Sequence, residues 1–328
     1  MTTGAHDTGT PHIGGPDIGA IGPARTAQRT GARVGDRMTA GRALPLVPAI
    51  GLLLIFLAGP IVWAFAGSLT DRALSGPRAA NPQFIGFDNF ARLFADPVLP
   101  LSIGVTVAFV VGSAIIGQNI LGLALAVLFR SGSRAVAGTV GVVVVTAWVL
   151  PEIVAAFVSY AFLSADGTLN HLLGAVGIAG PNWLYAFPVV AIILANTWRG
   201  TAFSMMIYRA ALDDVPLEVV ESSMLDGAGG WQRLRLITLP MIRPTIFTNL
   251  MLTTLQTLSV FTLIWVMTRG GPGNQSSTLP VLAYTEAFQF GDIGYGNAIA
   301  VVMLALGAVF SIAYVLSLRA QGSQGGRA

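Results

Sequence analysis

The sequence predicts an all-α, polytopic membrane protein with six transmembrane helices and a polar cytoplasmic loop between the fourth and the fifth. Three observations support this prediction. Hydrophobic residues make up 54% of the 328 residues and charged residues only 10%, whereas soluble domains carry about 25% charged residues. Six apolar runs reach the ~20 residues that a helix needs to cross a bilayer. A polar stretch, 212–243, lies between two of these runs and has no role in spanning the membrane.

The six expected spans differ in how many charges they carry. Four have none, the third has Glu152 alone, and the fourth has Arg199 inside it and Arg209 at its end. They form a predicted transmembrane domain, 44–318, followed by a short cytoplasmic tail, 319–328. The expected spans are Leu44–Ser68, Leu101–Phe129, Ala135–Leu163, Trp183–Ala211, Pro244–Thr268 and Ile293–Leu318.

Residues 1–43 are rich in Gly, Thr, Ala, Pro and Arg and show no apolar periodicity. Such a composition cannot bury enough apolar surface to fold, so we expect a disordered cytoplasmic tail. It does not read as a signal peptide, because the first apolar run begins near Leu44 and is long enough to span.

Arginine distribution predicts the orientation of the chain. With the N-terminus inside, the cytoplasmic segments hold thirteen arginines and the outer segments hold four. Because positive residues accumulate in cytoplasmic loops, both termini and the 212–243 loop are expected in the cytoplasm of a multi-pass plasma-membrane protein. Segments 69–100, 164–182 and 269–292 then face outward.

The residue types present exclude several classes of chemistry. The chain has no cysteine, so it has no disulfide, thiolate nucleophile or cysteine metal site. All 18 basic residues are arginine, and a P-loop ATPase needs a lysine that reaches the nucleotide phosphates. His6, His12 and His171 are too scattered for a metal site. We therefore expect no catalytic residue, no cofactor, no metal, no enzymatic activity and no nucleic-acid partner; any ATP hydrolysis belongs to another chain.

The polar loop predicts a short helix, a sharp turn and a second helical stretch. Pro216 suits the first turn of a helix, where a missing N–H costs nothing, and Gly227 allows the turn. The second stretch, 231–239, ends at Pro240. The apolar residues of the first helix, spaced at i, i+3 and i+7, are Leu217, Val220 and Met224. Such a helix–turn–helix can lodge in a groove of a partner protein; a solvated connector is the alternative.

The spacing of this loop resembles the EAA loop of bacterial ABC importer permeases. Glu221-Ser222-Ser223 is followed at that family's spacing by Gly227, Ile237 and Leu239-Pro240. Ser-Ser stands where the family usually has Ala-Ala, while Asp226-Gly227-Ala228 agrees with it. In that family the loop is the coupling helix that docks on a cytoplasmic ATPase. The resemblance therefore implies an ATPase-coupling role for Glu218, Glu221, Ser222, Ser223, Asp226, Gly227, Ala228, Ile237, Leu239 and Pro240.

Other stretches resemble the carbohydrate branch of these permeases, the maltose and glycerol-phosphate type. The resemblance covers about 50–318 and rests on 84–90, 166–170, 197–199 with Phe203, 268–272 and 294–298. It implies a subunit that forms half of the translocation path for a sugar or related polyol. It also implies three kinds of partner: a pair of ABC ATPase subunits, a second permease in a heterodimer, and an extracytoplasmic substrate-binding protein.

Polar residues inside the predicted spans are candidates for the substrate path, because polar groups in a membrane usually face the bundle interior or water. Sugars are bound by planar polar side chains and aromatic faces. The candidates are Glu152, Asn196, Trp198, Arg199 and Gln256. The alternative for each, which the sequence favours, is a structural role such as a hydrogen bond between helices.

Two other classes of function fit the sequence less well. A self-contained secondary transporter or channel usually shows internal repeats, and no convincing repeat relates the two halves of this chain. An intramembrane enzyme needs clustered acids, a nucleophile with its base, or metal ligands at membrane depth, which Glu152 alone does not supply.

Overall fold

A computed structural model describes residues 1–2, 4, 47–131 and 134–325. Most of the predicted tail 1–43, and the first residues of the first expected span, lie outside the described residues. Contacts divide the chain into two units, Met1–Leu53 and Leu54–Ala328. The helix α2 (Val47–Leu53) belongs to the first unit, and every contact discussed below lies within the second.

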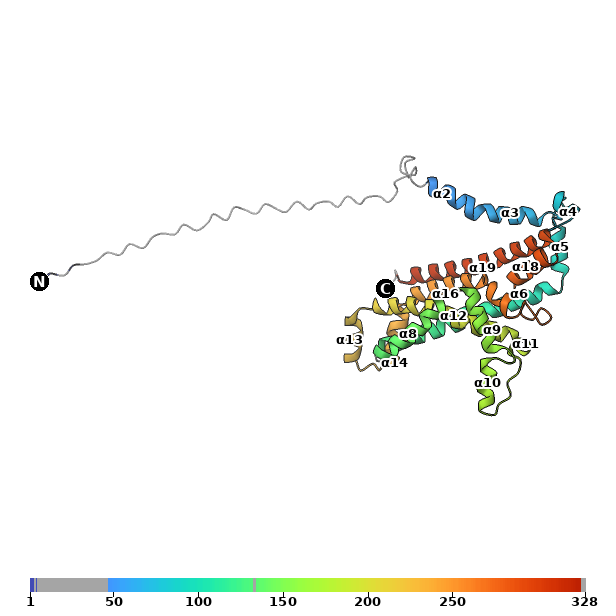
Figure 1. Cartoon of the computed structure of the whole chain (residues 1–328). Coiled ribbons are helices and arrows are strands. Elements are labelled where there is room, and N and C mark those ends of the chain that lie inside the picture. Colours follow the sequence, from blue (N-terminus) through green and yellow to red (C-terminus); the bar gives the residue numbers. More distant parts are fainter. Residues whose placement is uncertain (3, 5–46, 132–133, 326–328) are drawn as a thin grey trace. The chain divides into compact units, whose positions relative to one another are not determined.

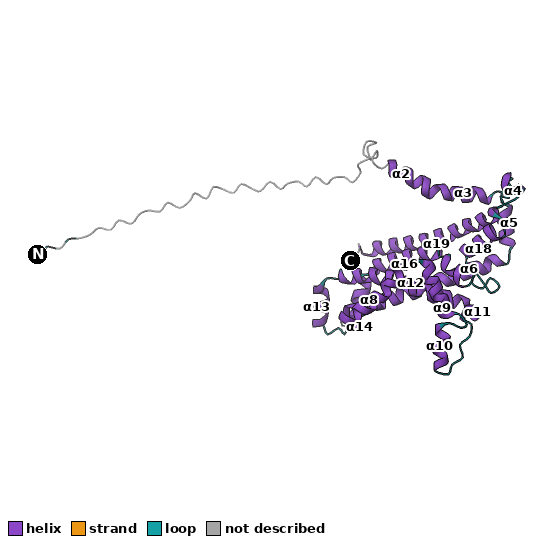
Figure 2. Cartoon of the chain, viewed as in Figure 1, coloured by secondary structure: helices purple, strands orange, loops and turns teal. Residues whose placement is uncertain are grey.

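Helices account for the secondary structure of the second unit (Figures 1 and 2), and in its described part strand pairing is limited to one isolated bridge between Thr70 and Phe84. In chain order the elements are η2 (Leu54–Ala58), α3 (Gly59–Ser68), α4 (Pro77–Ala80), α5 (Asp88–Ala95), α6 (Val98–Phe109), η3 (Val110–Gln118), α7 (Asn119–Ser131), α8 (Arg134–Val149), α9 (Glu152–Leu163), α10 (Thr168–Ala175), α11 (Trp183–Ala186), α12 (Pro188–Asp213), α13 (Leu217–Leu225), α14 (Gly230–Arg233), η4 (Leu234–Thr238), α15 (Leu239–Met241), α16 (Arg243–Leu258), α17 (Thr262–Met267), α18 (Leu279–Tyr284), η5 (Thr285–Gln289) and α19 (Ile293–Gly325).

Five helical stretches among the described residues are long and apolar enough to cross a membrane. They confirm the all-α membrane fold class. Four of them overlap expected spans one, two, four and six. The stretches are Val47–Ser68, Val98–Arg130, Glu152–Ala175, Pro188–Asp213 and Ile293–Ser317. The count of six spans stays a prediction, because the third and fifth expected spans differ from the structure.

The third expected span, Ala135–Leu163, is two helices rather than one. Helix α8 ends at Val149 and α9 begins at Glu152. Between them Pro151 has an extended backbone, with φ −52° and ψ 141°. A proline disfavours helical geometry in the residue before it and lacks an N–H for the helix ladder, which explains the interruption. We name residues 150–151 the α8–α9 break.

The fifth expected span, Pro244–Thr268, is also interrupted. Helix α16 ends at Leu258 and α17 begins at Thr262. We name residues 259–261 the α16–α17 break.

The other differences between the predicted and the observed elements lie at the ends of helices. A separate short helix, α11, precedes α12. Helix α15 continues through Pro240, which was expected to end the second stretch. Helix α19 extends into the segment expected as a C-terminal tail.

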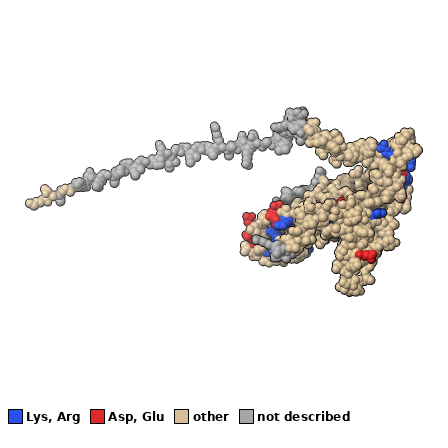
Figure 3. All heavy atoms as spheres, viewed as in Figure 1, with Lys and Arg blue, Asp and Glu red and all other residues tan. Residues whose placement is uncertain are grey.

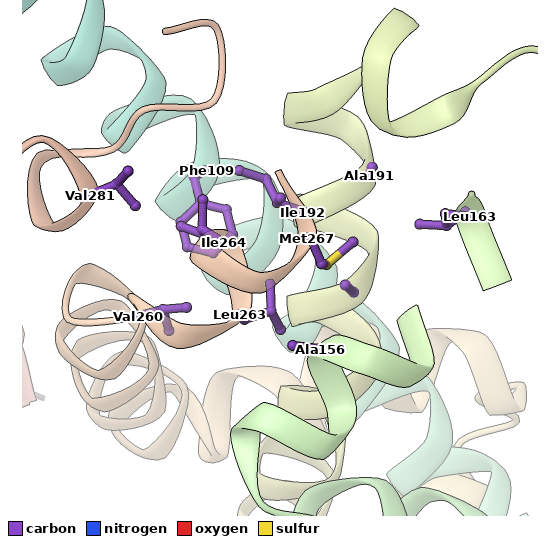
Figure 4. Packing of buried hydrophobic residues seen from close by; sticks show 11 residues of the cluster. Phe109, Ala156, Leu163, Ala191, Ile192, Val260, Leu263, Ile264, Met267 and Val281 are labelled. Carbon is purple, nitrogen blue, oxygen red and sulfur yellow. The ribbon is translucent and has the colours of Figure 1, made fainter. Parts of the chain in front are cut away.

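Helix α12 lies at the centre of the bundle and packs against α7, η3, α8 and α16. The apolar core around it includes residues of α17. Figure 4 shows Leu263, Ile264 and Met267 of α17 beside Phe109 of α6 and Ile192 of α12. These side chains are nearly all excluded from solvent. Burial of that extent anchors the short helix α17 although it has only six residues.

On the face of the second unit shown in Figure 3, charged side chains of both signs gather mainly at two places, and a separate acidic patch lies near α10. One surrounds α13 and α14, and the other surrounds α5; the helices between them carry few charges. Because a charge is costly inside a bilayer, this distribution agrees with an apolar band crossed by the long helices. Helix α19 runs between these two regions (Figure 1).

Candidate substrate path and coupling surface

The two helix breaks meet through Glu152. Its Oε1 accepts a hydrogen bond of 3.0 Å from the backbone N–H of Leu263, in the first turn of α17. The first N–H groups of a helix have no partner within the helix, and a carboxylate there is also favoured by the helix dipole. Helices α9 and α17 pack together. Glu152, expected on the substrate path, therefore has a structural partner: it caps the helix that restarts after the α16–α17 break.

Polar and aromatic side chains surround the α16–α17 break. Gln256 and Ser259 are exposed there, and the Ser259 hydroxyl donates to the Gln256 carbonyl at 2.9 Å. A chain of rings follows. The centroid of Tyr284 lies 4.8 Å from those of Phe261 and Trp265, and 5.3 Å from that of Phe288. Discontinuous helices that bring polar groups to membrane depth are typical of transporter binding sites. This break is therefore a candidate binding surface for a solute.

Asn196 points into the bundle and connects helices. Its Nδ2 donates to the hydroxyls of Ser113 at 2.8 Å and Thr257 at 3.4 Å. Gln118 donates in turn to the Asn196 carbonyl at 3.2 Å. All four residues are buried. The amide of Asn196 thus holds η3, α12 and α16 together, which is the structural role that the sequence favoured.

A second buried network was not anticipated. Asn119 accepts hydrogen bonds on Oδ1 from the hydroxyl of Tyr208 and from Nδ2 of Asn249, the latter at 2.8 Å. The same Asn249 amide donates to the Ser204 hydroxyl at 2.9 Å, and Asn119 donates to the Thr253 hydroxyl at 3.3 Å. The sequence carries a signal for it: the polar residues 249, 253 and 257 recur every four positions and so share one face of α16.

The remaining substrate-path candidates lie apart from these networks. Trp198 is 40% exposed and Gln256 is exposed, whereas Asn196 is buried. Arg199 is half-buried, and its Nε has no hydrogen-bond partner among the described residues. No ion pair between Glu152 and Arg199 is present within the described part of the chain. The five candidates therefore do not form one cluster.

The turn of the polar loop has the geometry that Gly227 was expected to provide. Helix α13 ends at Leu225, and Gly227 follows with φ 78°. Its N–H bonds to the Met224 carbonyl and the Ala228 N–H bonds to the Ser223 carbonyl, both at 3.0 Å. This pair of bonds is a Schellman motif, in which a left-handed residue closes the helix. Helix α14 then begins beyond Gly229, whose N–H donates to Gln232 Oε1 at 2.9 Å.

The apolar residues on one face of the first helix of the loop differ in burial. Val220 packs against the buried cluster formed by Tyr208, Leu212 and Ile242, whereas Leu217 and Met224 are exposed. The predicted stripe therefore contacts the bundle at Val220 and leaves two apolar side chains on the surface.

The exposed side of this loop combines acids with large apolar residues. Leu225 is 89% exposed and Trp231 is 71% exposed. Large apolar side chains exposed on a polar surface are candidates for protein contact. Among the predicted coupling residues, the exposed ones are Glu218, Glu221, Ser222, Asp226, Gly227 and Pro240; Ala228, Ile237 and Leu239 are half-buried, and Ser223 is buried.

At the other charged region, α5 is tied to the start of α19. Arg92 forms an ion pair with Asp292 at 2.9 Å, and the Tyr295 hydroxyl donates to Asp96 at 2.9 Å. Burial raises the pKa of the nearby Glu286, an effect that Arg92 opposes and the two aspartates reinforce. These contacts tie α5 to the start of α19 at one end of the bundle. Within the described residues, no cluster of His, Asp and Glu could hold a metal ion.

Comparison with known proteins shows a clear family relationship. The family model described as "Binding-protein-dependent transport system inner membrane component" matches residues 118–322. The trehalose/maltose transport system permease protein MalF of Thermococcus litoralis is 30% identical over 280 residues, which cover 83% of this chain and 91% of that protein. The sulfoquinovosyl glycerol transport system permease protein SmoG of Agrobacterium fabrum is 31% identical over 293 residues, covering 87% and 92%.

A solved structure has the same fold. A chain from the crystal structure of a bacterial ABC transporter involved in the import of the acidic polysaccharide alginate matches with a TM-score of 0.72 at 24% identity. The match covers 84% of this chain and 94% of that one.

Proposed function

The chain belongs to the family of binding-protein-dependent transport system inner membrane components, and from that premise we propose that it forms half of the translocation path for a sugar or related polyol in an ATP-driven importer. Membership makes it a multi-pass membrane subunit of a transport system that works with a binding protein, and not an enzyme. Relatives named for trehalose/maltose and for sulfoquinovosyl glycerol support a carbohydrate as the cargo.

The observation that carries the proposal is the α16–α17 break. Exposed Gln256 offers an amide that both donates and accepts hydrogen bonds, and the rings of Phe261, Trp265 and Tyr284 follow directly. A sugar or polyol, which has both hydroxyl groups and an apolar C–H face, fits this combination of an amide and aromatic rings. At this break we assign contact with the solute to Gln256, which is exposed, and we propose separate contacts along α12 for Trp198, which is exposed, and Arg199, which is half-buried. Glu152 and Asn196 position the helices that carry them.

The polar loop serves as the coupling surface for a separate ATPase. Exposed Leu225 and Trp231 fill pockets on that partner, and the acids around them orient the docked loop. The Schellman turn at Gly227 keeps α13 and α14 at a constant angle, so closure of two ATPases would move the helices of this chain as a rigid unit. A second, different permease supplies the other half of the path, and both termini lie in the cytoplasm.

The test is uptake by proteoliposomes that contain this chain, its ATPase and second permease, with the binding protein outside. Radiolabelled trehalose, maltose and sorbitol are the probes. We expect uptake that depends on enclosed ATP. It should fall by about fivefold to a hundredfold in Gln256→Ala, because a solute hydroxyl without its hydrogen-bond partner costs ~1–3 kcal/mol. Gln275→Ala, an exposed glutamine in an outer segment, is the control. Uptake without ATP would point to a secondary transporter instead.

A further inference from the structure

A cavity of about 560 Å³ opens between three segments of the second unit. One wall comes from the end of α9 and the turn after it, with Tyr160 and Asp166. A second comes from α11 and the residue before it, with Tyr185 and Asn182, and the third from 267–272. The volume falls within the ~300–1,000 Å³ that is usual for small-molecule sites. We name this cavity the vestibule site; it lies outside the α16–α17 break.

The base of the vestibule site is rigid. Met267 is buried and Leu184 half-buried, and both pack in the core cluster that surrounds α17. Packed cores resist a change of shape, so this floor keeps the cavity open without a ligand.

The side chain of Asn170 holds two walls together. Its Nδ2 donates to the Ala165 carbonyl at 2.8 Å and to the Pro181 carbonyl at 2.9 Å. Its Oδ1 accepts from the Trp183 indole N–H at 2.8 Å. Since Asn170 uses both its donor and its acceptor groups on the walls, it positions the cavity and does not bind a ligand. The third wall is held by Ser276, whose hydroxyl oxygen lies 2.8 Å from the Thr268 hydroxyl and 2.7 Å from the Gly271 carbonyl.

The groups that face the cavity, by contrast, are free. Tyr160 is 46% and Tyr185 66% exposed. Within the described residues, the side-chain polar atoms of both tyrosines, Asp166 and Asn182 make no hydrogen bond or ion pair with the protein. Two rings with polar tips, a carboxylate and an amide therefore converge on one space with their bonding capacity unused.

We propose that the vestibule site is a second carbohydrate-binding subsite, which takes a neutral sugar or polyol before it reaches the α16–α17 break. Asp166 accepts hydrogen bonds from two hydroxyls, Asn182 donates and accepts, and the tyrosine rings cover the C–H face. The lining contains a carboxylate and, among the described residues, no arginine, so an anionic sugar is repelled. This inference rests on the proposed function, because it requires that the segments 164–182 and 269–292 face the delivered solute.

The test measures binding to the chain alone, in lipid nanodiscs without the binding protein. Saturation-transfer NMR with trehalose, maltose and sorbitol reports the neutral probes, and glucose 6-phosphate serves as the anionic one. We expect at least one neutral probe to bind, with a Kd that rises about three- to tenfold in Tyr185→Ala and in Asp166→Asn. We expect glucose 6-phosphate to bind no more tightly than the neutral probes. Phe290→Ala, which removes another exposed ring outside the cavity, should bind as the parent does.

Both substitutions are at exposed positions and Asp166→Asn keeps the side-chain shape, so they should not unfold the chain; the thermal midpoint of each variant checks this. The proposal is overturned if no neutral probe binds the parent, or if the two variants bind the probes as the parent does. Variants that keep sugar binding but lose affinity for the binding protein would also overturn it, because the cavity would then receive a protein side chain. The proposed function is tested separately: it is overturned if the parent chain shows no ATP-dependent uptake.

Discussion

Asn119 shows at the scale of one residue how polar groups stabilise this bundle. Its amide joins α7 to Tyr208 of α12 and to Asn249 and Thr253 of α16. All of these residues are buried. A buried polar group without a hydrogen-bond partner is costly, so each group of this network depends on the others.

Asn119→Ala is expected to destabilise the bundle by about 2 kcal/mol. The variant removes three hydrogen bonds to other helices and one to the Ala114 carbonyl of the preceding turn, and interhelical bonds in membrane proteins average ~0.6 kcal/mol each. Unfolding of the purified chain by increasing SDS in mixed micelles measures the change. Thr146→Ala removes one bond within α8 from an exposed residue and should change stability little. Equal stability of the two variants would contradict a central role for Asn119.

At the scale of the element, the short helix α17 depends on a side chain from another helix. Glu152 satisfies the Leu263 N–H, and without it the first turn of α17 has an unpaired donor in an apolar surrounding. The same carboxylate was a candidate for solute contact. A pair of substitutions separates the two roles.

Glu152→Gln should keep most of the transport rate and thermal stability, because the amide oxygen still accepts the hydrogen bond from Leu263. Glu152→Ala should lose both, since the donor is then unpaired at a cost of ~1–3 kcal/mol. Uptake by proteoliposomes and the thermal midpoint of the purified chain measure the two effects. If Glu152 instead contacts the solute through its charge, Gln will impair uptake as severely as Ala while leaving the midpoint intact.

The loop between α12 and α16 is the second element whose geometry depends on one residue. The space around Gly227 is open, with no atom within 4 Å of the position that a Cβ would occupy. The cost of a side chain there is therefore one of backbone conformation alone, since φ is 78°. That cost is ~1–2 kcal/mol, and larger for a β-branched residue.

Gly227→Val should leave the bundle folded and abolish ATP-coupled uptake, because the angle between α13 and α14 changes. Gly229→Val is the matched control: its φ of −65° and ψ of 162° are values that valine adopts without strain. Copurification of the ATPase and uptake of radiolabelled trehalose are the measurements. Normal uptake by Gly227→Val would count heavily against the loop as a rigid coupling element.

For the whole molecule, the distribution of charge decides which end faces the cytoplasm. The arginine excess in the predicted inner segments predicts that the region of α13 and α14 lies on that side. The chain has no cysteine, so a single introduced thiol reports its own location without interference.

Asp214→Cys, next to α13, and Gln275→Cys, before α18, are both at exposed positions. In intact cells an impermeant maleimide should label the thiol at 275 and not the one at 214, and opening the cells should make 214 reactive. The reverse pattern would invert the proposed orientation. Labelling of both positions in intact cells would mean that the loop is not sealed from the outside.

Much of the architecture is visible in the sequence because apolar length and charge deficit are local properties. They predict the all-α membrane class, and the spacing around Gly227 indicates the family, which comparison confirms. The sequence of the polar loop also predicts the turn at Gly227, since only a residue without a side chain takes a positive φ there at no cost. Proline at 151 carries a signal for the α8–α9 break, although an apolar run of that length favours a continuous span.

The α16–α17 break and the partners of the buried amides were decided by the tertiary structure. Residues 259–261 include neither glycine nor proline, so nothing local requires the helix to stop; the carboxylate of Glu152, from another helix, stabilises its restart. Likewise, composition does not tell whether a polar residue faces a neighbour or a solute. Asn196 lies among hydroxyls of two other elements, whereas Gln256 is exposed. Both outcomes depend on how α12 and α16 are rotated against one another. That rotation depends on the packing of the whole bundle, which no single segment contains.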